Sequence, residues 1–191
     1  MPNLFRVFPH VAAAKIHEPG GALYVPSQGG GRVDNPSAYA VLYLGDSAPG
    51  AIAEAFGRFP EWRASMLRGN PTLPDSRHAI ARYLLADDAP ICNLDDPQLL
   101  VELALRPSDI VSRDYDRTRR WARQLYTQKK WHGLRWWSYY NSDWASFALW
   151  DVGRLTIEEV TPLELGYAAI GEAARTIFRS VIREKQKSRK S

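Results

Sequence analysis

The sequence has a single cysteine, and this scarcity limits how the chain can be stabilised. Cys92 cannot form a disulfide within one chain, and it has no cysteine or histidine neighbour at the spacing of a zinc site. The four histidines, His10, His17, His78 and His132, are scattered. We therefore expect no metal site and no permanently bound cofactor, and the lone thiol favours a cytoplasmic location.

Long apolar runs are also missing from the sequence. No stretch approaches the roughly 20 apolar residues that a membrane-spanning helix needs, and the opening MPNLFRVFPH lacks the pattern of a secretory signal. Apolar residues make up 45% of the chain and charged residues 24%, which is ordinary for a globular protein. We expect a single domain over residues 1–191, with a core at about 4–165 and no membrane partner.

Several common catalytic motifs are absent as well. The chain has no P-loop, no dinucleotide-binding glycine motif after a strand, and no nucleophile elbow. Gly45-Asp46-Ser47 looks like the serine block of an esterase, yet the last histidine is His132 and no aspartate lies three residues before it. Ser47 is better explained as a helix cap.

The pattern of apolar residues predicts a mixed α/β or α+β domain. Strands are expected at 4–8, 39–45 and 155–160, and a pair each within 79–94 and 134–150. Helices are expected after Ser47, at a short segment capped by Asp96, from Asp114 to about Gln128, and as a basic helix over about 170–191. Glycines and prolines mark 18–36 as a loop, and 58–78 shows little periodicity.

Positive charge is concentrated near the C-terminus. The net charge is +4, and residues 175–191 contain seven lysines and arginines against Glu184 alone. A basic segment can meet nucleic acid or an acidic partner, but a solvated helix end is the simpler interpretation. Four arginines between 117 and 123 are also expected to face solvent: Arg117, Arg119, Arg120 and Arg123.

A set of polar residues at regular intervals carries the most specific signal. Arg32 follows a glycine run that includes Gly30 and Gly31, Tyr43 lies in the next strand, and Glu54 lies on the following helix. A guanidinium and a glycine-rich turn suit phosphate, and an aromatic face suits a flat cation. Glu54 stands among apolar residues, where a partly buried carboxylate needs a reason.

In this order the motifs resemble the RES domain, found in toxins of bacterial toxin–antitoxin pairs. The motifs are GGGR at 29–32, VLYLGDSAPGAIAE at 41–54, and GLRWWS at 133–138 followed by WASFALW. The resemblance runs from about Arg6 to Trp150. The family usually has an aromatic residue directly after the arginine, whereas Val33 and Asp34 follow Arg32 here, which changes the local shape of the loop.

The resemblance implies an α+β fold similar to ADP-ribosyltransferases, with a split mixed β-sheet core and flanking helices. It implies that NAD is the substrate and is degraded by phosphorolysis or hydrolysis, with inorganic phosphate a candidate co-substrate. Gly30, Gly31 and Arg32 would hold the pyrophosphate, Tyr43 the nicotinamide, and Glu54 would stabilise the oxocarbenium-like ribose. Ser138 would hold Glu54 or the nicotinamide amide.

Most of the aromatic cluster over 136–150 is expected to build core, and Tyr139 and Tyr140 are the candidates for lining the cleft. The resemblance also implies a cognate antitoxin with a helix-turn-helix DNA-binding domain, and leaves homodimerisation open. A protein mono-ADP-ribosyltransferase would use the same cleft with a different acceptor. A nucleic-acid-binding module is less favoured, because neither basic set is interleaved with aromatic residues that would stack on bases.

Overall fold

The computed structural model describes residues 1–26 and 29–183. Within them, seven strands form one sheet in the order β5-β6-β7-β2-β1-β4-β8, in which only β5 and β6 are parallel neighbours. The strands are β1 (Asn3–His10), β2 (Leu42–Gly45), β4 (Arg77–Leu85), β5 (Ile91–Asn93), β6 (Gly133–Trp137), β7 (Ala145–Leu149) and β8 (Leu155–Pro162). This mixed sheet with flanking helices confirms the predicted α+β class.

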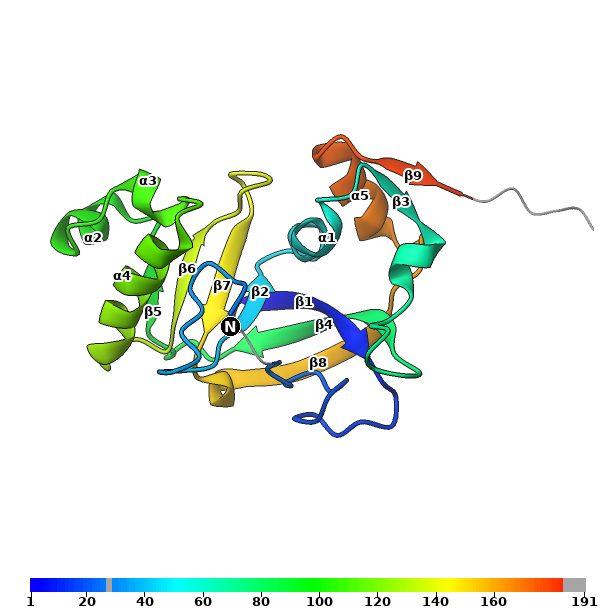
Figure 1. Ribbon diagram of the computed structural model, residues 1–191, viewed down its shortest axis with the longest axis horizontal. Helices are drawn as coiled ribbons and strands as arrows, with labels where there is room; N and C mark the ends of the chain where they lie inside the picture. The colour runs from blue at the N-terminus through cyan, green and yellow to red at the C-terminus, as the bar shows by residue number, and fades with distance from the viewer. Residues whose placement is uncertain (27–28, 184–191) are drawn as a thin grey trace, which may run out of the picture.

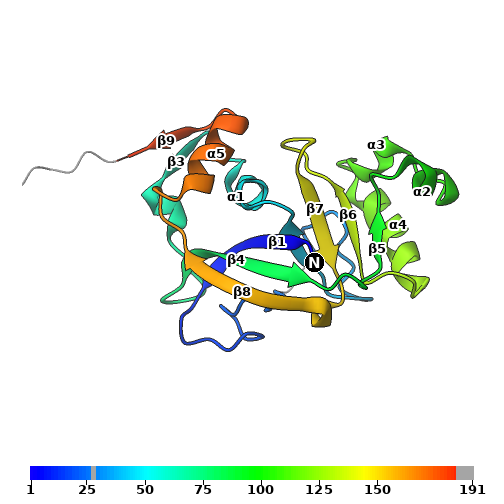
Figure 2. The same cartoon turned by 180° about the vertical axis from the view of Figure 1, so that it is seen from behind.

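The sheet is split where its two central strands meet. β1 and β2 share one register pair, Phe5 with Gly45, whereas β1 pairs with β4 over its whole length. The halves β1-β4-β8 and β5-β6-β7-β2 are therefore paired at one register position and otherwise held together by a shared apolar cluster. Figures 1 and 2 show β4 and β8 running across the molecule while β6 and β7 rise steeply beside them. The predicted split of the sheet is confirmed.

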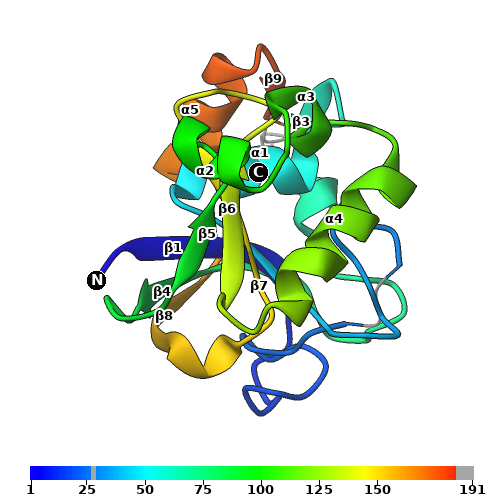
Figure 3. The same cartoon turned by 90° about the vertical axis from the view of Figure 1, so that its left-hand side faces the viewer.

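Helices cover the two halves separately. α2 (Pro97–Glu102), α3 (Pro107–Ile110) and α4 (Tyr115–Thr127) lie beside β5 and β6, while α1 (Ala48–Phe56) and α5 (Ala168–Thr176) lie together at the other end (Figures 1 and 3). Short 3-10 turns occur at Ala64–Leu67 and Val152–Arg154. No helix within the described ranges has the length and apolarity to cross a bilayer.

Apolar spacing explains how these helices pack. Trp121, Ala122 and Leu125 of α4 are buried against Leu134 and Trp136 of β6, as the predicted helical face requires. α4 begins where expected, since the Asp114 side chain accepts a hydrogen bond from the Arg117 amide at 3.1 Å. The predicted strands at 4–8 and 155–160 and the two strand pairs are also present.

Two predicted segments differ from the structure. Residues 58–78 are not wholly irregular, because β3 (Glu61–Arg63) lies within them and pairs in parallel with β9 (Ser180–Ile182). The expected helix over about 170–191 is wrong for residues 178–183: Phe178 has a φ of +55°, which a helix does not tolerate. The β-branched residues Val181 and Ile182 then form a strand. Residues 184–191, which hold most of the predicted basic run, lie outside the described residues.

Candidate active site

Glu54 is presented by helix α1 at the split in the sheet. The helix begins at a cap, because the Ser47 hydroxyl accepts a hydrogen bond from the Gly50 amide at 3.1 Å and Pro49 occupies the first turn. Ile52 and Phe56 are buried on the face toward α5. Glu54 lies on another face and its side chain is exposed. The expectation of a partly buried carboxylate is therefore wrong, because Glu54 opens into a solvent-accessible cavity.

Two serine hydroxyls hold one oxygen of Glu54. Ser138, directly after β6, donates to Glu54 Oε1 at 2.6 Å, and Ser146 of β7 donates to the same atom at 3.4 Å. Ser138 is only 3% exposed, so the donor end of this short bond is buried while the carboxylate end faces the cavity. Among the described residues, no hydrogen bond reaches Oε2. The carboxylate is thus fixed through one oxygen, and the other is available to a ligand.

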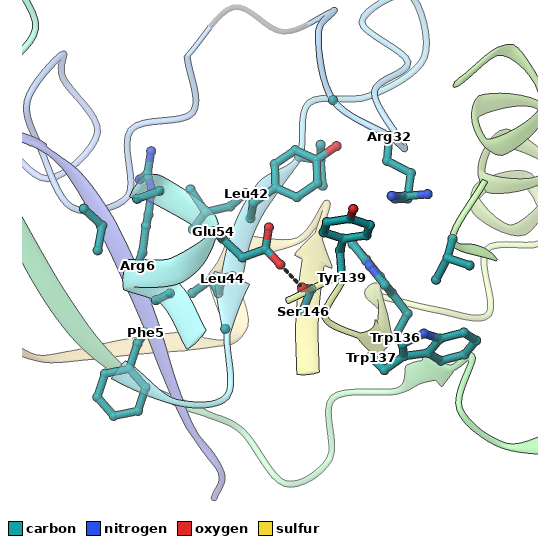
Figure 4. A pocket seen from close by; sticks show the side chains of 18 of the residues that line it. Phe5, Arg6, Arg32, Leu42, Leu44, Glu54, Trp136, Trp137, Tyr139 and Ser146 are labelled. Atoms are coloured by element: carbon teal, nitrogen blue, oxygen red, sulfur yellow. Dashed lines mark hydrogen bonds between the residues drawn. The ribbon is translucent and has the colours of Figure 1, made fainter. Parts of the chain in front are cut away.

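The cavity has a volume of about 400 Å³, within the usual range for small-molecule sites. Its walls come from β1, β2 and α1, from the segment leading into α4, and from the end of β6. Arg32, Tyr43 and Glu54 all line it, while Ser138 lies behind Glu54. In Figure 4 the Glu54 carboxylate lies between the side chains of Arg6 and Arg32, with a dashed line to Ser146. The structure thus brings Arg32, Tyr43, Glu54 and Ser138 together.

Arg32 combines a structural role with its position in the cavity wall. Its Nη1 donates to the carbonyl oxygens of Ile110 and Ser112, at 2.9 and 2.5 Å. The guanidinium also lies 5.8 Å from the centre of the Tyr115 ring. These contacts fasten the glycine loop to the segment before α4. The positive charge is retained at the cavity, although one nitrogen is already bonded to protein.

The glycine loop is organised around Asp34. The Gly29 and Gly31 amides both donate to Asp34 Oδ2, at 2.9 and 2.6 Å. The expectation that this turn offers its amides to a phosphate is therefore corrected, because an internal carboxylate already takes two of them. Gly31 still lines the cavity, whereas Gly30 is exposed outside its wall. Sequence reasoning missed Asp34. It treated the glycine amides as free to bind a phosphate and did not consider that the nearby Asp34 carboxylate could accept their hydrogen bonds.

Tyr43 lines the cavity, and its hydroxyl is held within the glycine loop. The hydroxyl donates to Asp34 Oδ1 at 2.6 Å and accepts from the Val33 amide at 3.2 Å. Burial, reinforced by the bond to Asp34, raises the pKa of the Tyr43 phenol well above its ordinary value. Tyr43 is therefore a neutral aromatic surface with a fully bonded hydroxyl.

Arg6 is a cavity residue that sequence reasoning did not identify. It lies on β1 and its Nη1 donates to the Ala22 carbonyl at 3.1 Å. Burial lowers the pKa of its guanidinium, yet arginine keeps its charge at neutral pH. The signal was a lone arginine inside the apolar strand LFRVF, a position where a charge is expensive. Arg6 gives the cavity a second cation.

Aromatic side chains complete the wall. Tyr139 lines the cavity and is bonded to Arg113 at 3.0 Å. Tyr115 and Trp137 also line it, and neither was selected from the sequence. Tyr140, the second candidate, instead packs with the apolar cluster of α1 and α5. Of the two predicted lining tyrosines, the structure places only Tyr139 in the cavity.

The arginines of α4 are not all solvated, contrary to expectation. Arg119 donates to the Gly29 carbonyl at 2.6 Å and to the Gly31 carbonyl at 3.1 Å. Arg117 pairs with the buried Asp109 at 2.6 Å. These two side chains fasten the loop and α3, which leaves less charge on this helix for a nucleic acid backbone.

Comparison with known proteins gives a family match and a structural likeness. A search of curated proteins gave no match. Among solved structures, the chain is similar to the crystal structure of the M. tuberculosis MbcT–MbcA toxin–antitoxin complex, with a TM-score of 0.58 and 15% identity over 92% of this chain and 88% of that one. The family model of the RES domain matches residues 3–166, which include Arg6, Arg32, Tyr43, Glu54 and Ser138. The chain therefore belongs to the RES-domain family.

Proposed function

We propose that the cavity binds NAD and that the protein breaks the bond between its nicotinamide and ribose. The observation that carries this proposal is the Glu54 carboxylate. It is exposed to the cavity, is held through one oxygen by Ser138 at 2.6 Å, and shares the cavity wall with Arg6 and Arg32. An oriented carboxylate suits a developing positive charge, and flanking arginines suit a charged phosphate ligand.

The polar groups of the cavity match the parts of NAD. The pyrophosphate is an anion, and Arg6 and Arg32 supply the cations that line the wall. The nicotinamide ring is a flat cation, and Tyr43 supplies an aromatic surface with a neutral phenol. Tyr115, Trp137 and Tyr139 offer further aromatic surface for the adenine.

The chemistry is a glycosyl transfer. The bond between ribose C1′ and the nicotinamide nitrogen breaks, its electron pair goes to that nitrogen, and neutral nicotinamide leaves. The ribose becomes oxocarbenium-like, and the negative charge of Glu54 stabilises it. An oxygen of water or inorganic phosphate then bonds to C1′, and the proton displaced from that acceptor passes to Glu54 or to solvent. Ser138 keeps Glu54 in place throughout.

We further propose that the protein is the toxin of a toxin–antitoxin pair in the cytoplasm, where NAD is available. The family assignment supports this, as does the likeness to a structure solved as a toxin–antitoxin complex. The partner expected from the resemblance is an antitoxin that carries a helix-turn-helix DNA-binding domain. Co-expression with the neighbouring gene product should restore growth and cellular NAD, whereas expression alone should lower both.

The direct test is to incubate the purified protein with NAD, with and without inorganic phosphate, and to resolve the products by mass. ADP-ribose identifies water as acceptor, and a phosphorylated ADP-ribose identifies phosphate. Release of nicotinamide only when an added protein substrate gains ADP-ribose would instead make the protein a mono-ADP-ribosyltransferase. Intact NAD in every arm, with the antitoxin removed and the protein folded, would contradict the proposal.

A further inference from the structure

Asp34 is a buried carboxylate that the proposed reaction does not use directly. It is 3% exposed, and none of the ion pairs within the described part of the chain includes it. Its partners are the Gly29 and Gly31 amides on Oδ2, and the Tyr43 hydroxyl on Oδ1 at 2.6 Å. Burying a carboxylate without a cation is costly unless hydrogen bonds compensate. This arrangement therefore calls for an explanation beyond closure of a loop.

The bond from Tyr43 to Asp34 changes the character of the aromatic ring. A phenol that donates a short hydrogen bond to a carboxylate gains electron density, and such charge-assisted bonds are strong where water is excluded. The Tyr43 hydroxyl is turned to the loop by Asp34 and the Val33 amide, so the ring is the part that meets the cavity. An electron-rich ring backed by a negative charge attracts a cation more strongly than an ordinary tyrosine does.

We propose that Asp34 is a positioning residue that makes the Tyr43 ring selective for a positively charged, oxidised nicotinamide over the neutral, reduced form. The inference rests on the proposed function, because it assumes that the nicotinamide lies against Tyr43. Asp34 acts through Tyr43 and touches no substrate. The protein would then bind NAD more tightly than NADH, so that the reduced dinucleotide would compete only weakly for the cavity.

Gly31 leaves the space that the Tyr43 hydroxyl and the Asp34 carboxylate occupy. A Cβ at position 31 would come within 2.4 Å of Tyr43 Oη and 2.6 Å of Asp34 Oδ1. Real Cβ atoms do not approach other atoms this closely, so one partner would have to move. The hydrogen bond between Tyr43 and Asp34 therefore requires a residue without a side chain at position 31, which glycine provides.

The experiment measures binding of NAD and NADH by isothermal titration in a Glu54→Gln background, where turnover does not obscure affinity. The parent variant should bind NAD more tightly than NADH. Adding Asp34→Asn keeps the shape and removes the charge, so the preference for NAD should fall by about three- to tenfold. The affinity for NADH should change by less than about twofold. Asp109→Asn, at a buried carboxylate outside the cavity wall, should leave the preference unchanged.

Each other outcome has a definite meaning. Equal weakening of NAD and NADH would overturn the inference, since it would show a purely structural role for Asp34, and so would an unchanged preference. If Asp34→Asn does not fold by thermal unfolding, Tyr43→Phe carries the same test, because it keeps the ring and removes the bond to Asp34. No binding of NAD to the Glu54→Gln parent would contradict the proposed function itself and, with it, this inference.

Discussion

At the scale of single residues, the environment of Glu54 is asymmetric. Ser138 and Ser146 donate to the same carboxylate oxygen, but at 2.6 and 3.4 Å they do so with very different strength. An oriented carboxylate stabilises charge better than a mobile one, because no reorganisation is needed as the charge develops. Ser138 should therefore matter more than Ser146.

We predict that Ser138→Ala lowers kcat for NAD cleavage by about 10- to 100-fold, since it removes the shorter bond to the reacting carboxylate. KM should change by less than about threefold, because Ser138 does not line the cavity. Steady-state rates of nicotinamide release measure both constants. Ser146→Ala is the matched control and should cost less than about fivefold; a larger loss in Ser146→Ala than in Ser138→Ala would contradict this view of the site.

Gly30 and Gly31 are neighbours in the loop, so alanine variants at these two positions form a second pair of test and control. A Cβ at Gly31 meets Tyr43 Oη and Asp34 Oδ1, whereas a Cβ at Gly30 meets nothing within 4 Å. Gly31→Ala should destabilise the fold by about 1–3 kcal/mol and weaken NAD binding, as overpacking does. Gly30→Ala should change stability by less than about 0.5 kcal/mol. Urea denaturation and titration with NAD measure both effects, and equal behaviour of the two variants would refute the close packing at Gly31.

Sequence reasoning found the residues whose chemistry is conspicuous by type and spacing. Arg32, Tyr43, Glu54 and Ser138 converge as expected. Asp34 and Arg6 were missed for different reasons. Asp34 accepts hydrogen bonds from the backbone amides of Gly29 and Gly31, and a sequence does not show which amides lie near a carboxylate. Arg6 looks like any polar residue of a half-buried strand, and only the split of the sheet places it at the cavity. Hydrogen-bond partners distant in sequence are not encoded in local pattern.

At the scale of elements, the start of α1 places the Glu54 carboxylate. The Ser47 cap fixes where the helix begins, and Glu54 follows two turns later. Ser47→Ala should reduce the free energy of unfolding by about 1 kcal/mol, because the Gly50 amide loses its acceptor. Urea denaturation measures this change. Ser142→Ala, at an exposed position between β6 and β7, should be neutral, and a neutral Ser47→Ala would contradict the role of the cap.

Elements with strong periodicity or clear caps were predictable, whereas β3 and β9, which among the described strands pair only with each other, were not. α4 and the strand pairs follow directly from apolar spacing and caps. The segment after Thr176 did not, because its apolar residues fit a helical face as well as a strand. The choice is made by pairing with β3, which comes from 61–63, far away in the sequence. Tertiary contacts override local preference in such cases.

At the scale of the whole molecule, the near-separation of the two half-sheets creates the cavity. One register pair, Phe5 with Gly45, joins them, and residues on both sides of this junction line the cavity. Each half has its own helical cover, while one buried apolar cluster contains residues of both halves. Ligands commonly bind where units of a fold meet. The resemblance of sequence motifs predicted this architecture, but spacing alone did not.

Alkaline pH should destabilise the whole fold. Burial raises the pKa of Tyr39 and Tyr83 from 10.0 to about 12, and that of Cys92 from 9.0 to about 12. Above pH 9 the unfolded chain loses these protons before the folded chain does, so the unfolded state binds fewer protons and stability falls as pH rises. The urea midpoint should be lower at pH 11 than at pH 8. Tyr83→Phe should reduce this difference, and an unchanged midpoint would contradict the burial of these groups.

The proposed function depends on Glu54 stabilising the ribose while NAD is cleaved in the cavity between the half-sheets. The most direct measurement is nicotinamide released from NAD by the wild type and by Glu54→Gln, with Glu172→Gln on the exposed surface of α5 as the matched control. We expect release by the wild type and Glu172→Gln alike, and a rate at least about 100-fold lower for Glu54→Gln. Equal release by Glu54→Gln, or no release by the folded wild type, would contradict it.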